Sequence, residues 1–489
     1  MLEKRRAGIL LPISCLPNPY GIGTFGKAAY DFVDFLKEAH QTYWQILPIG
    51  PTSFGDSPYS SPSTFAGNPY FIDLDLLSED NLLRAKDYVK QSINTEKIDY
   101  AYLYQTRYQI LKKAYERFLK MIPLDYASFV NNNYYWLHDY AIFMYLKDKH
   151  NGASFDVWED KYKYYNEEVL KEFSENEIGF YYFLQYEFSK QWHNLKTYAN
   201  SQGIQIIGDI PIYVAYDSAD VWANVKYFKL DKKLKPSRVA GCPPDAFCAD
   251  GQLWGNPLYN YKLMKSDGYS WWINRCKRAF ELYDVVRIDH FRGFEAYWSI
   301  PAGDKTAKGG KWVKGPNYSI FKAIKKNLGN KEFIAEDLGF LTEAVYKLVA
   351  KTKFPGMKVL EFAFDGNPKC EHLPENYTKN TVCYIGTHDN FPAKAWYESL
   401  KGRELNYANK YLKVDNSDLA TTKLIELAYQ SIANTVIIQM QDFLHLGKDA
   451  RINTPSTSSN NWVWRLNDEY NNTSLVNYIS TITKEAKRC

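Results

Sequence analysis

The chain has 489 residues, and 45% of them are hydrophobic, which is enough for a large buried core. The net charge of +4 comes from 60 basic and 56 acidic residues, and no long basic block stands out, so a nucleic-acid partner is not expected. No run approaches the ~18 apolar residues of a membrane span, which argues against a membrane partner. Seven scattered cysteines without a CxxC pair indicate reduced thiols and a cytoplasmic protein.

The N-terminal segment resembles the start of a signal peptide, because three basic residues at 4–6 precede an apolar run. That run is short, Pro12 interrupts it, and no small-residue cleavage site stands out downstream. We therefore predict a first β-strand there.

Eight segments read as short strands, bounded by turn residues and rich in β-branched side chains. Several are continuously apolar, as expected of parallel strands buried on both faces. Helical patterns at 27–39, 341–351 and 419–433 lie between them. The order predicts an α/β fold, a (β/α)8 TIM barrel. A doubly wound open sheet is the alternative, but no GxGxxG follows a strand. The predicted strands are 7–14, 42–49, 204–213, 285–290, 332–337, 357–364, 381–388 and 435–442.

Two long insertions interrupt the barrel pattern. About 150 residues separate the second and third strands, and they carry amphipathic helical patterns at 100–120, 134–150 and 179–199. About 70 residues separate the third and fourth strands. We expect one catalytic barrel over 1–489, with a mainly helical inserted subdomain at 51–203 and a second one at 214–284. Insertions after barrel strands lie above the active-site face.

Acidic side chains end several predicted strands, as in an active site at one end of a barrel. Arg287 and Asp289 share one strand face, so the cation favours an ionised Asp289, which suits a nucleophile. Glu336 ends an apolar strand, where partial desolvation raises the pKa of an acid/base. Asp389 and Asp209 end two further strands. Glycoside cleavage needs two such carboxylates.

Each of these residues also has an ordinary structural interpretation, since a lone Asp at a strand end is usually a cap. His290 and His388 adjoin two of the acids, and four acids at four strand ends favour catalysis. Metal hydrolysis fits less well, because Arg287 beside Asp289 opposes a cation. Aromatic residues make up 17% of the chain and suit stacking on sugar rings, but an aromatic core explains them as well.

Further motifs lie outside these strand ends. The sequence reads GDSPY at 55–59, FAGNPY at 65–70, GDIPIYV at 208–214, and PPD at 243–245 followed by GQLWGNP at 251–257. NWVWR follows at 461–465. With the acidic strand ends, they resemble the 4-α-glucanotransferases (amylomaltases) of glycoside hydrolase family 77, in the α-amylase clan. The resemblance covers residues 8–465.

The resemblance implies a retaining transglycosylase that acts on α-1,4-glucans and maltooligosaccharides as donors and acceptors, without a metal or an organic cofactor. By its motifs, Asp289 matches the nucleophile, Glu336 the acid/base and Asp389 the transition-state stabiliser. The segment at about 243–256 matches a flexible flap over the cleft. The matching substrate contacts are Ser57, Tyr59, Asp209, Asp245, Phe247, Gln252, Trp254, Arg287, His290, His388 and Asn461.

Two positions depart from the family pattern. Ala246 stands where many members have an aromatic residue in the flap, and Phe54 stands where some have a tyrosine in a second glucan-binding patch. Two rival functions stay open from the sequence. One is an α-1,4-glucan hydrolase of the same clan, and the other is a non-catalytic glucan-binding protein on a degenerate barrel.

Overall fold

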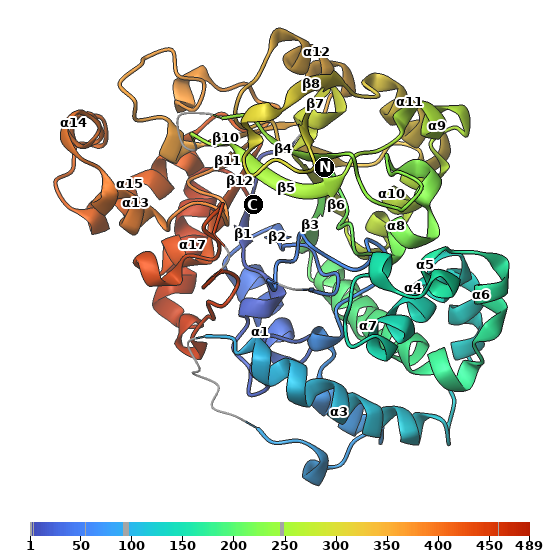
Figure 1. The fold of residues 1–489 in the computed structure, drawn as a ribbon. Helices are drawn as coiled ribbons and strands as arrows, with labels where there is room; N and C mark the ends of the chain where they lie inside the picture. The colour runs from blue at the N-terminus through green and yellow to red at the C-terminus, as the bar shows by residue number, and fades with distance from the viewer. Residues whose placement is uncertain (1, 3, 54, 91–96, 245–248, 458) are drawn as a thin grey trace.

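Parallel strands form a closed barrel at the centre of the molecule (Figure 1). The computed structural model describes residues 2, 4–53, 55–90, 97–244, 249–457 and 459–489. Within these ranges the barrel has eight strands in the order β1-β12-β11-β10-β9-β6-β3-β2, which confirms the predicted TIM barrel and all eight predicted strands. The strands are β1 (Arg6–Leu10), β2 (Tyr43–Gln45), β3 (Gln205–Pro211), β6 (Val285–Asp289), β9 (Phe333–Ala335), β10 (Gly356–Val359), β11 (Thr381–Tyr384) and β12 (Thr435–Gln439).

Burial on both faces explains the apolar runs of these strands. Every residue of β2, β11 and β12 is buried, so neither face can carry solvent-facing polar residues. The observed strands are shorter than predicted at their carboxyl ends: 42–49 contains only Tyr43–Gln45. Beyond that point the chain leaves the ladder at the mouth of the barrel. These end residues can therefore direct their side chains into a site.

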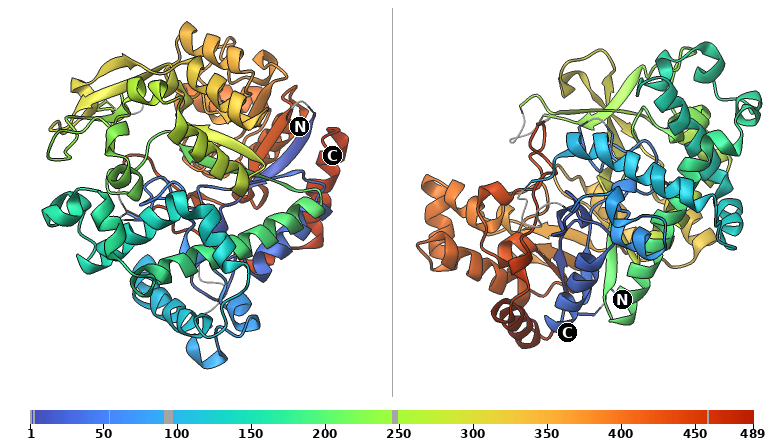
Figure 2. Two further views of the ribbon diagram at one scale, coloured as in Figure 1. Left: turned by 90° about the vertical axis from the view of Figure 1, so that its right-hand side faces the viewer. Right: turned by 90° about the horizontal axis from the view of Figure 1, so that it is seen from below.

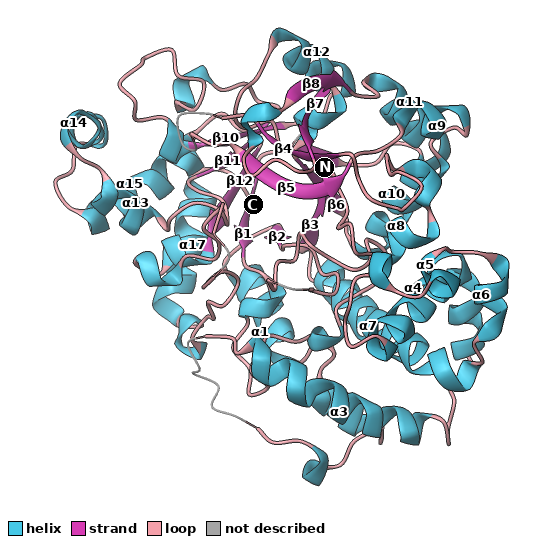
Figure 3. Cartoon of the chain, in the orientation of Figure 1, coloured by secondary structure: helices cyan, strands magenta, loops and turns pink. Residues whose placement is uncertain are grey.

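Helices surround the barrel (Figure 3). In α1 (Lys27–Glu38), Phe32, Val33, Phe35 and Leu36 are buried on one face, as the amphipathic pattern predicts. No helix in the described ranges combines the length and the apolarity that a membrane crossing requires. The other helices outside the insertions are α11 (Tyr318–Leu328), α12 (Glu343–Thr352), α13 (Ala393–Ser399), α14 (Gly402–Leu412), α15 (Ser417–Gln430), α16 (Met440–Phe443) and α17 (Thr473–Glu485).

The chain between β2 and β3 is helical, as predicted, and forms one side of the molecule (Figure 2). Buried Arg107 fastens this insertion to the rest of the fold: its guanidinium donates at 2.8 Å to the carbonyl of Tyr20, outside the insertion, and at 2.8 Å to that of Tyr70, within it. The helices are α2 (Leu74–Glu79), α3 (Tyr100–Phe118), α4 (Tyr126–Lys149), α5 (Asp160–Lys163), α6 (Glu167–Glu172) and α7 (Glu175–Ser201).

An antiparallel sheet that the sequence analysis did not predict stands beside the barrel (Figure 1). In the described part of the chain it has four strands, in the order β5-β4-β7-β8. Two come from the second insertion, β4 (Arg238–Cys242) and β5 (Gln252–Pro257). The others, β7 (Ala296–Pro301) and β8 (Lys311–Lys314), follow barrel strand β6. The second insertion also contains α8 (Ala219–Ala223), α9 (Tyr261–Ser266) and α10 (Ser270–Leu282).

The barrel closes where β1 pairs with β12, with Arg6 opposite Thr435 and Leu10 opposite Gln439. Arg488 lies buried near this seam. Its guanidinium donates to the carbonyls of Tyr429, Ser431 and Ala433 at 2.7–2.9 Å. The seam therefore joins segments from opposite ends of the sequence.

Gly8 tests how tightly the barrel is packed. A Cβ at this position would lie 2.5 Å from both the Cβ and the carbonyl oxygen of Tyr43 on β2. We expect Gly8→Ala to lower the free energy of unfolding by about 1–3 kcal/mol, because backbone of a neighbouring strand must move. Chemical denaturation measures this loss. At Gly303 a Cβ meets nothing within 4 Å, so Gly303→Ala is the matched control. Equal stability of the two variants would contradict the prediction.

Candidate functional site

A buried cation organises the carboxyl ends of β3 and β6. In the strand register Asp209 lies opposite Arg287, so both side chains are at the same level of the barrel. Arg287 Nη1 donates to Asp209 Oδ2 at 2.6 Å and to Asp289 Oδ1 at 3.1 Å. The Tyr59 hydroxyl donates to Asp209 Oδ2 at 2.8 Å. Arg287 and Asp289 do share one strand face, and Asp209 is the closer partner of the cation.

The Glu336 carboxyl group follows β9 and lies beside the end of β6. Its Oε2 accepts the backbone N–H of His290 at 2.6 Å, and its Oε1 accepts that of Leu338 at 2.8 Å. The N–H of Phe291 also donates to the Glu336 carbonyl, at 3.1 Å. His290 has φ 51°, a left-handed conformation that is uncommon outside glycine. The turn after β6 therefore holds both the side chain and the backbone of Glu336.

Asp289 and Glu336 form an electrostatically coupled pair. Burial raises the pKa of Asp289 to about 8, Arg287 opposes this rise, and nearby Glu336 adds to it. Burial also raises the pKa of Glu336, while Arg287 and the backbone donors Leu338 and His290 oppose the rise. Arg287 acts on Asp289 in the direction that the sequence predicted, towards the ionised form, and burial acts against it. Burial therefore works against the ionised form of both carboxyl groups, and Arg287 works in favour of it.

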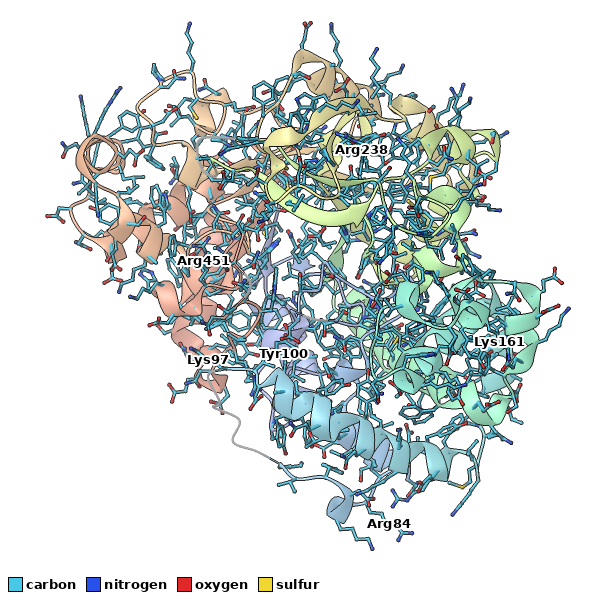
Figure 4. All side chains as sticks on the ribbon, in the orientation of Figure 1. Arg84, Lys97, Tyr100, Lys161, Arg238 and Arg451 are labelled. Carbon is cyan, nitrogen blue, oxygen red and sulfur yellow. The ribbon has the colours of Figure 1, made fainter. Side chains whose placement is uncertain are left out.

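Asp389 lies in the turn after β11 and is held by a distant loop. Asn453 Nδ2 donates to Asp389 Oδ1 at 2.6 Å, and Arg451 Nη2 donates to the Asp389 carbonyl at 2.5 Å (Figure 4 labels Arg451). His388 Nε2 lies 3.3 Å from Asp389 Oδ1. Burial lowers the pKa of His388, and Asp389 opposes this change. The turn and the loop together fix the direction of this carboxylate.

Two polar atoms of the site lack protein partners among the described residues. Asp209 Oδ1 and His290 Nε2 are buried and accept or donate no hydrogen bond there. Burial, helped by the charge of Arg292, lowers the pKa of His290 to about 3, so its ring is neutral at ordinary pH. Because buried polar groups are usually paired, these atoms are suited to a polar ligand.

Aromatic side chains line the same region. The rings of Tyr59 and His388 stack with centroids 5.3 Å apart, and Trp462 lies 6.0 Å from His388. Trp254 meets His290 edge to face at 4.8 Å. Flat aromatic faces beside hydroxyl-binding groups match the two sides of a pyranose ring.

The remaining predicted residues are placed as follows. Ser57 Oγ accepts from the Tyr59 N–H at 3.2 Å, and Gln252 Oε1 accepts from Trp254 Nε1 at 3.0 Å. Asn461 accepts from the Thr454 N–H at 2.9 Å, within the loop that holds Asp389. The predicted contacts Asp245 and Phe247, like Ala246 and Phe54, lie outside the described residues.

Sequence reasoning missed several residues around Asp389 and His290. Asn453 and Arg451 hold Asp389, and Arg292 influences His290. The first two belong to no motif that was singled out, although they lie shortly before the NWVWR segment at 461–465. Arg292 belongs to the VRIDHFRG segment. It follows the end of the strand, and nothing in the local sequence indicates that it lies close to His290.

A TIM barrel with two neighbouring, partly buried carboxyl groups at its mouth has the architecture of a barrel enzyme. The family profile described as 4-alpha-glucanotransferase matches residues 11–471. The chain belongs to this family. It is 48% identical over 484 residues to the 4-alpha-glucanotransferase of Clostridium butyricum, covering 98% of this chain and 99% of that one. A 4-alpha-glucanotransferase of Streptococcus pneumoniae is 45% identical, with coverage of 96% and 94%.

Solved structures of amylomaltases share the fold of this chain. The amylomaltase of Streptococcus agalactiae, solved in complex with acarbose, superposes with a TM-score of 0.96. It is 41% identical and covers 99% of this chain and 100% of its own. The amylomaltase of Corynebacterium glutamicum has a TM-score of 0.77 at 18% identity, covering 99% of this chain and 75% of its own, which shows a shared fold.

The effect of the Arg287 charge on the pKa of Asp289 can be measured by titration. We expect Arg287→Gln to raise the pKa of Asp289 further, by about 1 unit or more, because the opposing cation is lost. Infrared difference spectroscopy of the carboxylic-acid band across pH measures this shift, and Asp289→Asn identifies the band. Arg238→Gln, in the antiparallel sheet, serves as the control. A pKa that falls or stays unchanged would contradict the electrostatic account.

Proposed function

We propose that this protein is a retaining 4-α-glucanotransferase, which moves a segment of an α-1,4-glucan to the 4-hydroxyl of an acceptor glucan or glucose. The observation that carries the proposal is the coupled pair of Asp289 and Glu336 beside Arg287. Family membership adds the substrate class. The amylomaltase of Streptococcus agalactiae was solved in complex with acarbose, which supports a ligand of this kind for the present protein.

The first half of the reaction forms a covalent intermediate. The Asp289 carboxylate attacks the anomeric carbon, and the bond from that carbon to the glycosidic oxygen breaks. Glu336 gives its proton to this oxygen, and the shortened glucan leaves. This step needs one carboxyl group of the pair ionised and the other protonated. The N–H groups of His290 and Leu338 then stabilise the Glu336 carboxylate.

The second half returns the enzyme to its starting state. The 4-hydroxyl of an acceptor glucan loses its proton to Glu336 and attacks the anomeric carbon, and the bond to Asp289 breaks. Retaining enzymes hold the two carboxyls about 5–5.5 Å apart, and inverting enzymes about 6.5–9.5 Å. Asp289 and Glu336 end neighbouring strands, and paired strands lie ~4.8 Å apart, which favours retention.

The other site residues bind and orient the sugar in this proposal. Asp389, fixed by Asn453, accepts hydrogen bonds from ring hydroxyls as the sugar distorts. Asp209 Oδ1 and His290 Nε2, unpartnered among the described residues, take further hydroxyls. The proposed substrate contacts remain Ser57, Tyr59, Asp209, Asp245, Phe247, Gln252, Trp254, Arg287, His290, His388 and Asn461.

The proposal includes the division of the chain into one catalytic barrel with inserted regions at 51–203 and 214–284, of which the second carries the flap.

A cytoplasmic location is also part of the proposal. Free thiols at Cys15, Cys276, Cys370, Cys383 and Cys489 support a reducing compartment.

The nucleophile is tested by substitution. We expect Asp289→Asn to lower kcat for maltotriose by about 10³-fold or more, because no covalent intermediate can form. The thermal midpoint should not fall, since the amide replaces a carboxyl group of the same shape. Rates come from chromatography of the products. Wild-type turnover in this variant would exclude Asp289 as the nucleophile.

Product analysis separates transfer from hydrolysis. With maltotriose alone we expect glucose and a ladder of longer maltooligosaccharides, while the number of reducing ends stays constant because each cleavage is followed by transfer. Chromatography and a reducing-end assay measure the two quantities. Reducing ends that rise in step with cleavage would indicate the hydrolase, and unchanged maltotriose would indicate a glucan-binding protein without catalysis.

A further inference from the structure

We propose that Arg292 is a positioning residue, which fixes the direction of the Glu336 carboxyl group without touching the substrate. The inference rests on the proposed role of Glu336 as acid/base. Arg292 is 4% exposed and lies in the short helical turn Phe291–Phe294 that follows β6. Two separate connections lead from Arg292 to Glu336.

The first connection runs through the turn that contains Arg292. His290 begins this turn, and its N–H donates to Glu336 Oε2. The N–H of Phe291 donates to the Glu336 carbonyl. A shift of this turn therefore moves the N–H groups of His290 and Phe291, and with them Glu336.

The second connection runs through the loop after Glu336. Arg292 Nη1 donates to the carbonyl of Phe340. Two residues earlier, the N–H of Leu338 donates to Glu336 Oε1. One guanidinium thus joins the turn that holds one carboxyl oxygen to the loop that holds the other.

The antiparallel sheet provides the surface on which this guanidinium rests. The guanidinium carbon of Arg292 lies 3.7 Å from the ring centroid of Trp312 on β8, a stacking contact that a planar guanidinium makes well. Trp298 on β7 supports Trp312 edge to face at 5.0 Å. The backbone carbonyl of Glu295 accepts from the Gly315 N–H at 2.7 Å, which joins the turn to the chain just after β8. A lysine keeps the charge but loses the flat, forked geometry.

Arg292→Lys and a matched control test the inference. Arg238 on β4 of the same sheet (labelled in Figure 4) donates to the Ser299 side chain and carbonyl, and within the described ranges none of its hydrogen bonds reaches the loops around Glu336. With maltotriose as donor and acceptor, we expect Arg292→Lys to lower kcat by about 10–100-fold, a share of what a positioned acid/base contributes. The KM should change less than about threefold, and Arg238→Lys should keep wild-type kcat and KM.

A second donor distinguishes a misplaced acid/base from a general structural defect. In α-maltotriosyl fluoride, the C1–F bond breaks as Asp289 attacks, and fluoride leaves without a proton. Azide then attacks C1, the bond to Asp289 breaks, and azide has no proton to give up. Neither step needs Glu336. We therefore expect folded Arg292→Lys protein to form maltotriosyl azide at a rate within about threefold of wild type.

Glu336→Gln separates failure of the inference from failure of the proposed function. If this variant is inactive on maltotriose but active with fluoride and azide, Glu336 is the acid/base. In that case, three results would overturn the positioning role. Arg292→Lys could lose the same factor in rate with both donors, or it could keep wild-type activity. Arg238→Lys could also lose as much kcat as Arg292→Lys. If Glu336→Gln is active on maltotriose, or is not rescued by fluoride and azide, the proposed function and the inference fall together.

Discussion

The site depends on the contact of the Arg287 guanidinium with two carboxylates, the buried Asp209 and the partly buried Asp289. Asp209 and Asp289 lie on neighbouring strands at the mouth of the barrel, and burial penalises their charges unless a cation is close. Arg287 provides that cation from inside the barrel. Even so, it does not overcome the burial of Asp289, whose pKa rises to about 8. Burial and the cation thus act in opposite directions on the same carboxyl group, and their balance sets its tendency to ionise.

Rigid support for this electrostatic arrangement comes from parts of the chain that are distant in sequence. Glu336 is held by N–H donors from the turn after β6 and from its own loop. Asp389 is held from the loop around Asn453. A carboxyl group held by several fixed donors does not need to reorient when charge develops, which is the main electrostatic advantage of an enzyme site over water.

The sequence predicted the barrel well because its strands are buried on both faces and therefore carry continuous apolar runs. It predicted Asp289, Glu336 and Asp389 as a group because all three follow such strands. It missed the antiparallel sheet, since a strand such as β5 alternates in burial and contains glycine and proline. It also missed Asn453 and Arg451, because a contact from a distant loop leaves no local pattern. The balance between burial and Arg287 at Asp289 depends on three-dimensional desolvation, which spacing along a strand does not reveal.

The seam between β1 and β12 has a consequence for how the protein is made. Arg6 pairs with Thr435, so 429 positions of chain separate the two partners. At the usual ribosomal rate of about 5–20 residues per second, β1 waits roughly 20–90 s before β12 has been synthesised. During that interval the edge of β1 has unpaired backbone groups that can pair with other chains. The yield of folded protein in a cell should therefore depend on how well this first edge is protected during translation.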